Sequence, residues 1–131
     1  MLTDEEVEKR KSLWLALSDL WLDTEMTEKD CRYIVREMIN SGYPLEKIEK
    51  ILVEEVAPVV YSNLINIFPG GNWEGFEEEW LYNAIIENLK ASEKSFIRQT
   101  WVKNNVNKFL MMKLVRENWI KIVEIYQTTK I

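Results

Sequence analysis

The sequence has 131 residues, of which 47% are hydrophobic and 30% charged, a balance typical of one soluble globular domain. It contains no histidine and a single cysteine, Cys31, which excludes Ser-His-Asp and Cys-His catalysis, His-based zinc motifs and an internal disulfide bond. The N-terminus is acidic, and no apolar run approaches the ~20 residues of a membrane span. We therefore expect a single cytoplasmic domain over residues 1–131.

Two capping signals open the chain. Thr3 with Glu6 forms a capping box, and we expect the helix that follows to end near Leu22. Its apolar face comprises Leu13, Trp14, Leu17, Leu20 and Trp21. Thr27 with Asp30 caps a second helix, which ends at Ser41-Gly42. The apolar stripe of this second helix comprises Cys31, Ile34, Val35 and Met38.

The stretch around which we expect the chain to be organised follows directly. Pro44 suits a first helical turn, and Leu45, Ile48, Leu52 and Val56 then recur at helical spacing. Pro58 disfavours helix at the preceding residue and removes a donor, so it predicts a stop or a kink. We expect a central helix to about Val56 and a short, angled fourth helix beginning at Pro58.

The second half begins with the strongest helix breaker, Phe68–Asn72, which predicts a loop. A fifth helix from near Gly75 shows the apolar residues Phe76, Trp80, Ala84, Ile85 and Leu89. Phe96, Ile97, Trp101 and Val102 fit a further helical face, and Asn104-Asn105 predicts a break. The apolar residues of the last predicted helix are Phe109, Met112, Trp119, Val123 and Tyr126. Residues 120–125 are also rich in β-branched side chains, so a small C-terminal β-hairpin in the last forty residues is the alternative.

Together these elements predict an all-α fold, a single-domain antiparallel helical bundle of about six to seven helices. Trp14, Trp21, Trp101 and Trp119 fall on apolar stripes, and we expect them in the core. Trp73, beside the Gly70-Gly71 loop, is interpreted either as a lid on the core or as an exposed contact residue.

The charge is distributed unevenly along the chain. Residues 1–90 carry 9 Lys/Arg and 19 Asp/Glu, a net charge of −10, whereas residues 91–131 carry 8 and 3, a net charge of +5. An acidic body favours a basic partner and repels nucleic acid, while a basic segment favours the opposite. Ordinary solvated surface is the simpler interpretation of both halves.

Residues 73–80 are the strongest candidate for a binding surface, because four glutamates lie among three aromatic residues there. Favourable helix-start chemistry is the simpler interpretation of the early glutamates. We predict that a partner binds at this junction, with two acidic residues of the 23–25 connection nearby. The predicted partner-binding residues are Trp73, Glu74, Glu77, Glu78, Glu79, Asp23 and Glu25.

Carboxylates are the one remaining signal for an enzyme. Asp19, Asp23 and Glu25 lie close in sequence, and oxygen ligands suit Mg²⁺ or Ca²⁺, but their spacing fits no calcium-loop pattern. We therefore predict no metal, no cofactor and no catalytic residue. Asp19 is alternatively a buried hydrogen-bond acceptor that orders a neighbouring loop.

Several segments read together resemble a known family. They are Trp14–Glu25, Ser41–Tyr43, Glu55–Pro58 with Tyr61 and Asn63-Leu64, and Trp73–Phe76 with Trp80-Leu81. This set is similar to a bacterial family of small acidic proteins, a domain of unknown function associated with polymorphic-toxin loci. The chain looks like an immunity protein of contact-dependent growth inhibition. The resemblance covers roughly residues 10–90; Pro44 departs from its pattern, and nothing is carried over after Leu89.

The resemblance implies a non-enzymatic protein that binds and neutralises a cognate toxin in the cytosol. Many such toxins are nucleases and therefore basic, which the acidic body would suit. A carboxylate and divalent-metal enzyme, or a general protein-interaction module, is the alternative. Nucleic-acid binding through the basic segment would use Lys103, Lys108, Lys113 and Arg116. We do not expect nucleic acid as a partner, because the net charge is negative, nor a membrane, because no apolar run is long enough to span one.

Overall fold

The computed structural model describes residues 2–22, 25–61 and 76–130, and these residues form helices and connections without a strand. The elements before the first long gap in this description are α1 (Asp4–Ser18), the 3-10 helix η1 (Asp19–Trp21), α2 (Glu28–Ser41), α3 (Leu45–Ile51), the π-helix η2 (Leu52–Val56) and α4 (Ala57–Val60). Those after it are α6 (Glu78–Lys94), α7 (Phe96–Lys103), α8 (Asn105–Met112) and α9 (Arg116–Lys130). The predicted all-α bundle is confirmed, and residues 120–125 lie in a helix rather than in the alternative hairpin.

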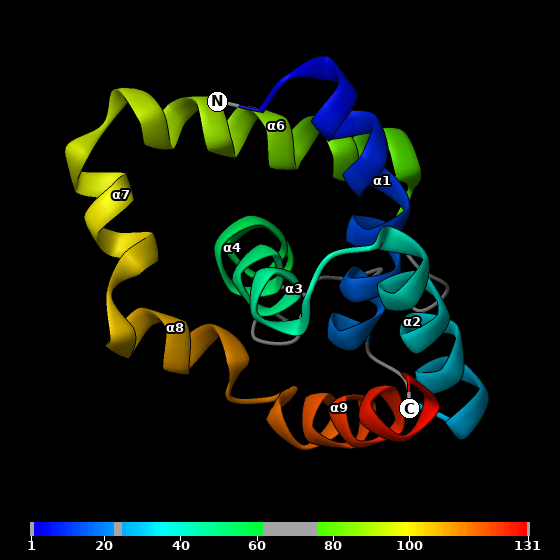
Figure 1. Ribbon diagram of the computed structural model, residues 1–131. Coiled ribbons are helices and arrows are strands. Elements are labelled where there is room, and N and C mark those ends of the chain that lie inside the picture. Colours follow the sequence, from blue (N-terminus) through cyan, green and yellow to red (C-terminus); the bar gives the residue numbers. More distant parts are fainter. Residues whose placement is uncertain (1, 23–24, 62–75, 131) are drawn as a thin grey trace.

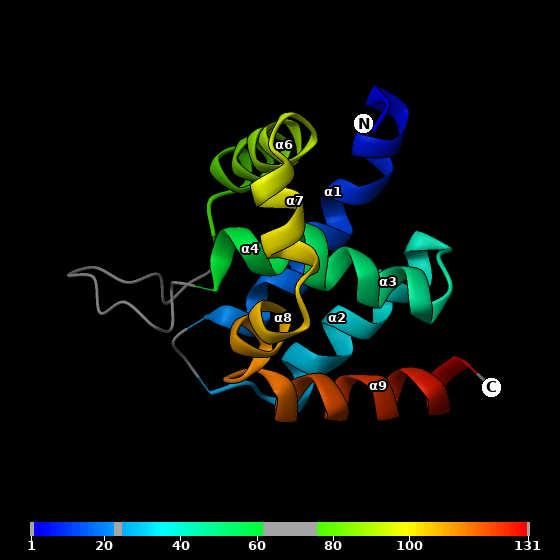
Figure 2. The same ribbon diagram turned by 90° about the vertical axis from the view of Figure 1, so that its left-hand side faces the viewer.

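The α3–η2–α4 helix occupies the centre of the molecule, as the sequence predicts. Figure 1 views it end-on, with α6, α7, α8 and α9 following one another around it and with α1 and α2 on the remaining side. α1 and α2 run antiparallel and pack together, and α9 packs along α2 (Figures 1 and 2). No helix in residues 2–22, 25–61 or 76–130 is long and apolar enough to cross a membrane.

The local signals at the helix ends act as predicted. Both capping boxes form: the Thr3 hydroxyl accepts from the Glu6 amide and the Thr27 hydroxyl from the Asp30 amide, each at 3.2 Å. Gly42 ends α2 in the left-handed conformation, φ +74°, which favours glycine. Asn104 caps α8 by accepting from the amides of Val106 and Asn107, which confirms the predicted break.

Pro58 does not break the central helix. η2 and α4 follow α3 without an intervening non-helical residue, and Pro58 lies in the first turn of α4. Because proline has no N–H and its ring crowds the carbonyl four residues earlier, an α-helical turn could not pass through Glu54 unchanged. The wider π turn at Leu52–Val56 accommodates this mismatch, so the predicted angled fourth helix is instead a continuation.

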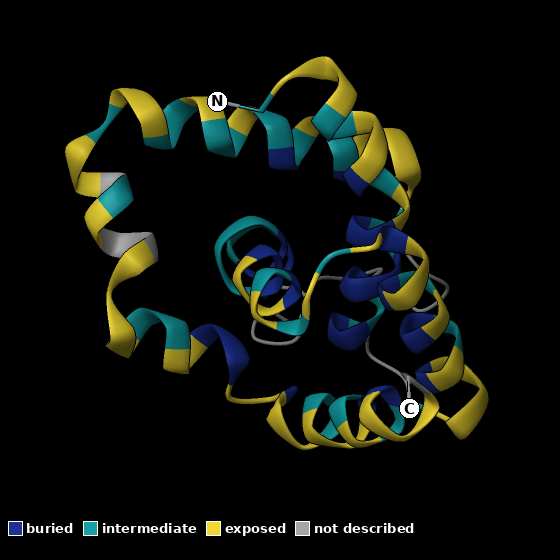
Figure 3. Ribbon diagram, in the orientation of Figure 1, coloured by how far each residue is buried: buried dark blue, intermediate teal, exposed yellow. Residues whose placement is uncertain are grey.

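The core is formed by the predicted stripes of α1, α2 and α3–η2, and buried residues concentrate on their inward faces (Figure 3). Trp14 and Trp21 are buried, as predicted, and the Trp21 indole donates to the Met111 carbonyl oxygen at 3.1 Å, which joins η1 to α8. Phe96, Ile97 and Phe109, which fit predicted helical faces in the sequence, are exposed. Trp119 is half-buried, and the side chain of Trp101 lies outside the part of the chain described.

Candidate functional site

The predicted binding surface at residues 73–80 is described from Phe76 onward. Trp73, Glu74 and Asp23 lie outside the described residues. Glu77 is the N-cap of α6: its carboxylate accepts from the amides of Glu79 at 3.1 Å and Trp80 at 2.7 Å. The carboxylate of Glu77 is thereby used to start the helix, as the simpler interpretation of this glutamate suggests.

Trp80 is the exposed aromatic residue of this region. The sequence places it on the apolar stripe of the helix, but the buried residues of α6 are Leu81 and Ile85, which turns Trp80 toward solvent. Its side chain is 50% exposed and stacks on Phe76, with ring centroids 5.8 Å apart and planes inclined by 16°. The stacking holds a large apolar surface in one orientation without burying it.

Carboxylates adjoin this aromatic pair in the first turn of α6. Glu78 and Glu79 are exposed in the first turn of α6. Further along α6, Tyr82 is linked to Glu8 of α1, because Lys11 lies 2.7 Å from the Glu8 carboxylate and 5.4 Å from the Tyr82 ring centroid. Burial raises the pKa of the Tyr82 hydroxyl, and the charge of Glu78 and then of Glu79 and Glu8 adds to the effect. We call Phe76, Trp80, Glu78 and Glu79 the acidic–aromatic surface.

Glu25 belongs to a different part of the molecule. It is exposed three residues before α2 begins. The start of α2 lies beside α9, at the edge opposite α6, in both Figure 1 and Figure 2. The structure therefore brings Glu78 and Glu79 together with Trp80 and leaves Glu25 apart from them.

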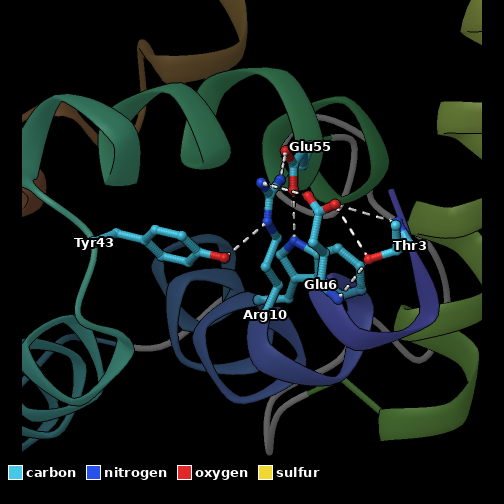
Figure 4. A network of polar contacts seen from close by, with 6 residues as sticks. Thr3, Glu6, Arg10, Tyr43 and Glu55 are labelled. Atoms are coloured by element: carbon cyan, nitrogen blue, oxygen red, sulfur yellow. Dashed lines mark hydrogen bonds and ion pairs between the residues drawn. The ribbon is translucent and has the colours of Figure 1, made fainter. Parts of the chain in front are cut away.

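A buried polar network joins α1 to the central helix, and no local sequence pattern indicates its cation, Arg10. Arg10 is 4% exposed, and its guanidinium lies 2.5 Å from the Glu55 carboxylate. The other carboxylate oxygen of Glu55 accepts from the Trp14 indole at 2.9 Å, and Arg10 Nε donates to the Tyr43 hydroxyl at 3.3 Å (Figure 4). Glu6, of the α1 capping box, lies 3.8 Å from the guanidinium. Glu55 and Tyr43 lie in segments of the family resemblance, whereas Arg10 falls at its margin.

The network adjoins an open pocket of about 330 Å³. The pocket lies between the central helix, the end of α6 and α7, and Glu54 and Glu55 of the π turn both contribute to its lining. Both carboxylate oxygens of Glu55 are engaged by Arg10 and Trp14, so Glu55 acts there as a structural anion. The contacts of Glu55 with Arg10 and Trp14 indicate an architectural role.

The carboxylates proposed for a metal enzyme are not assembled as a metal site where the structure describes them. In residues 2–22, 25–61 and 76–130, no group of three or more Cys, Asp or Glu side chains could hold a metal ion. Asp19 begins η1, and its backbone carbonyl accepts from the Leu22 amide at 3.2 Å, which closes that turn. Burial, together with the charge of Asp30, raises the pKa of the Asp19 carboxyl from 3.8 to about 6.

This raised pKa predicts a pH-dependent stability. The folded protein binds the Asp19 proton more tightly than the unfolded chain, so stability falls as pH rises from about 4 to about 6. Asp19→Asn removes the ionisation and should raise the free energy of unfolding at pH 7 by on the order of 1 to 3 kcal/mol. Urea unfolding across this pH range measures the effect. A variant that is less stable than the natural protein at pH 7 would contradict the prediction.

The fold and the surface define a class: an all-α protein that presents an acidic, aromatic-centred surface. Residues 8–125 match a family described as a domain of unknown function, DUF7079, and the chain belongs to that family. Comparison with curated proteins and with solved structures found no match.

Proposed function

We propose that this protein is a protein-binding module that uses the acidic–aromatic surface to bind a basic protein. More specifically, we propose an immunity protein that neutralises a cognate toxin domain in the cytoplasm. The observation that carries the proposal is Trp80, half exposed and stacked on Phe76 among the carboxylates of Glu78 and Glu79.

The physical argument has two parts. A protein interface concentrates its binding energy in a few aromatic or arginine residues that become fully desolvated in the complex. Trp80 offers such an anchor, already oriented by its stack on Phe76. The surrounding carboxylates attract a basic partner and accelerate association, an effect that falls with ionic strength.

The experiment is complex formation with the basic toxin domain encoded next to this gene. We expect a 1:1 complex in size-exclusion chromatography, and protection of cells that produce the toxin. Charge reversal of Glu78 and Glu79 to lysine should lower the association rate constant about tenfold at low salt and reduce its salt dependence. Stopped-flow fluorescence measures the rate.

The matched control reverses Glu46 and Glu49, two exposed carboxylates of α3, to lysine. The net charge changes equally, so a rate lowered only by the α6 reversals locates the encounter surface. A neighbouring toxin that neither binds nor is neutralised would refute the immunity function. Binding with equal rates for both double variants would keep the immunity function and refute this surface.

A further inference from the structure

One stretch of the chain combines charge and exposed apolar surface in an unusual way. Residues 94–116 contain six Lys or Arg and no Asp or Glu. The same stretch covers α7 and α8 and holds most of the large apolar side chains that the structure leaves exposed. These are Phe96 at 82%, Ile97 at 80%, Val106 at 66%, Phe109 at 49%, Leu110 at 50% and Leu114 at 57% exposure.

The architecture explains why these residues lack a covering element. α7 and α8 form the edge of the molecule opposite α1 and α2 (Figure 1), and Figure 3 shows the exposed class along α7 and on much of α8. α8 contributes Met111 and Met112 to the core, and Val115 just after it is also buried. Its opposite side carries Val106 and Leu110, and Leu114 follows four residues later in the turn after α8, so α8 is apolar on two sides.

Cations border this apolar surface. Lys103 and Lys113 are exposed, Lys108 is partly exposed, and the Arg116 guanidinium lies over the Phe109 ring, 4.9 Å from its centroid. We call the six exposed apolar residues above, with Lys103, Lys108, Lys113 and Arg116, the basic–apolar surface. Its partner must be anionic and must also accept aliphatic side chains.

Two classes of anionic partner fit this surface poorly. Nucleic-acid interfaces are polar and use aromatic platforms for base stacking, whereas four of the six exposed apolar residues here are aliphatic: Ile97, Val106, Leu110 and Leu114. Protein interfaces are depleted in lysine, and three of the four cations here are lysines. An interfacial membrane-binding helix instead combines Phe and Leu, which insert, with Lys and Arg, which contact anionic headgroups.

We propose that the basic–apolar surface docks on an anionic lipid bilayer, with α7 and α8 lying in the headgroup region. Phe96 and Ile97, at the corner between α6 and α7, are the most exposed apolar side chains and would insert. Residues 94–116 carry no acid, and the acidic–aromatic surface lies at the far end of α6. Glu54, Glu55 and Glu93 line, together with Lys103, the pocket between α7 and the central helix, which lies on the side of α7 that faces the rest of the molecule. This inference does not rest on the proposed toxin binding and differs from the sequence-based expectation of no membrane partner.

The test is co-sedimentation of the full chain with phosphatidylcholine vesicles that contain or lack phosphatidylserine. We expect binding only to the phosphatidylserine vesicles, weakened by added salt. Lys108→Glu with Lys113→Glu should lower the partition coefficient about 25-fold or more. Phe96→Ser with Ile97→Ser should lower it about tenfold or more, because two inserting side chains are lost.

The control for charge is Lys9→Glu with Lys29→Glu, on α1 and α2, which changes the net charge equally and should leave partitioning within about twofold. Circular dichroism confirms that each variant folds, and the Phe96 and Ile97 side chains are exposed enough for replacement without loss of the core. Absence of phosphatidylserine-dependent binding would overturn the proposal. An equal loss of vesicle partitioning in the control variant would also overturn it. So would binding of DNA or of a second copy of the chain by this surface without binding of lipid.

Discussion

Glu55→Ala is expected to lower the free energy of unfolding by about 3–5 kcal/mol, the cost of leaving a buried charge without its partner. Arg10 is 4% exposed and stays protonated, and Glu55 supplies the carboxylate at 2.5 Å. The same carboxylate accepts from the Trp14 indole, whose donor would also lose its partner. Glu6, at 3.8 Å and 45% exposed, is too distant and too solvated to replace it.

Urea unfolding, followed by circular dichroism, measures this loss. Glu54→Ala is the matched control, since Glu54 is the adjacent glutamate of the same π turn and does not reach Arg10. We expect Glu54→Ala to change stability by about 1 kcal/mol or less. Equal losses of stability for the two variants would show that substitution in the π turn itself, rather than loss of the ion pair, destabilises the protein.

A second comparison separates the charge from the packing. Arg10→Met combined with Glu55→Met removes both charges and should be markedly more stable than Glu55→Ala, because no unpaired ion remains. A double variant as unstable as Glu55→Ala would indicate that the hydrogen bonds of Trp14 and Tyr43, rather than the ion pair, dominate the network.

Trp80→Ala should weaken toxin binding by about 2 kcal/mol or more, roughly 30-fold in Kd, if the acidic–aromatic surface is the docking site. The effect should appear mainly as faster dissociation, because truncating an anchor changes contacts rather than steering. The free energy of unfolding should fall by only about 0.5–1.5 kcal/mol, which is the contribution of the aromatic stacking on Phe76 that the variant loses.

Isothermal titration calorimetry measures the affinity, and Phe109→Ala is the matched control. Phe109 is 49% exposed, as Trp80 is 50% exposed, but it lies on α8 in the basic–apolar surface. A larger loss of toxin affinity for Phe109→Ala than for Trp80→Ala would indicate that the toxin docks on α8 instead. Unfolding of Trp80→Ala would show that Trp80 contributes more to the fold than its exposure suggests.

The sequence by itself determined the local features of this protein. Capping boxes at Thr3 and Thr27, the left-handed end of α2 at Gly42 and the cap at Asn104 depend on residues within a few positions of one another. Helical spacing of apolar residues likewise predicted the buried faces of α1, α2 and the central helix. Of the candidate site, the sequence predicted the acidic and aromatic character of the start of α6.

Only the tertiary structure decided which side chains meet across the chain. Arg10 and Glu55 are separated by 45 positions, so no local pattern could pair them, and Glu55 alone reads as ordinary wetted surface. The tertiary structure also decided the exposure of Trp80, Phe96, Ile97 and Phe109, which fit apolar helical faces in the sequence and are exposed in the fold. An apolar stripe is buried only if another element covers it. The face that α6 turns inward, and the absence of a cover over the outer edge of α7 and α8 among the residues described, follow from the packing of the whole chain.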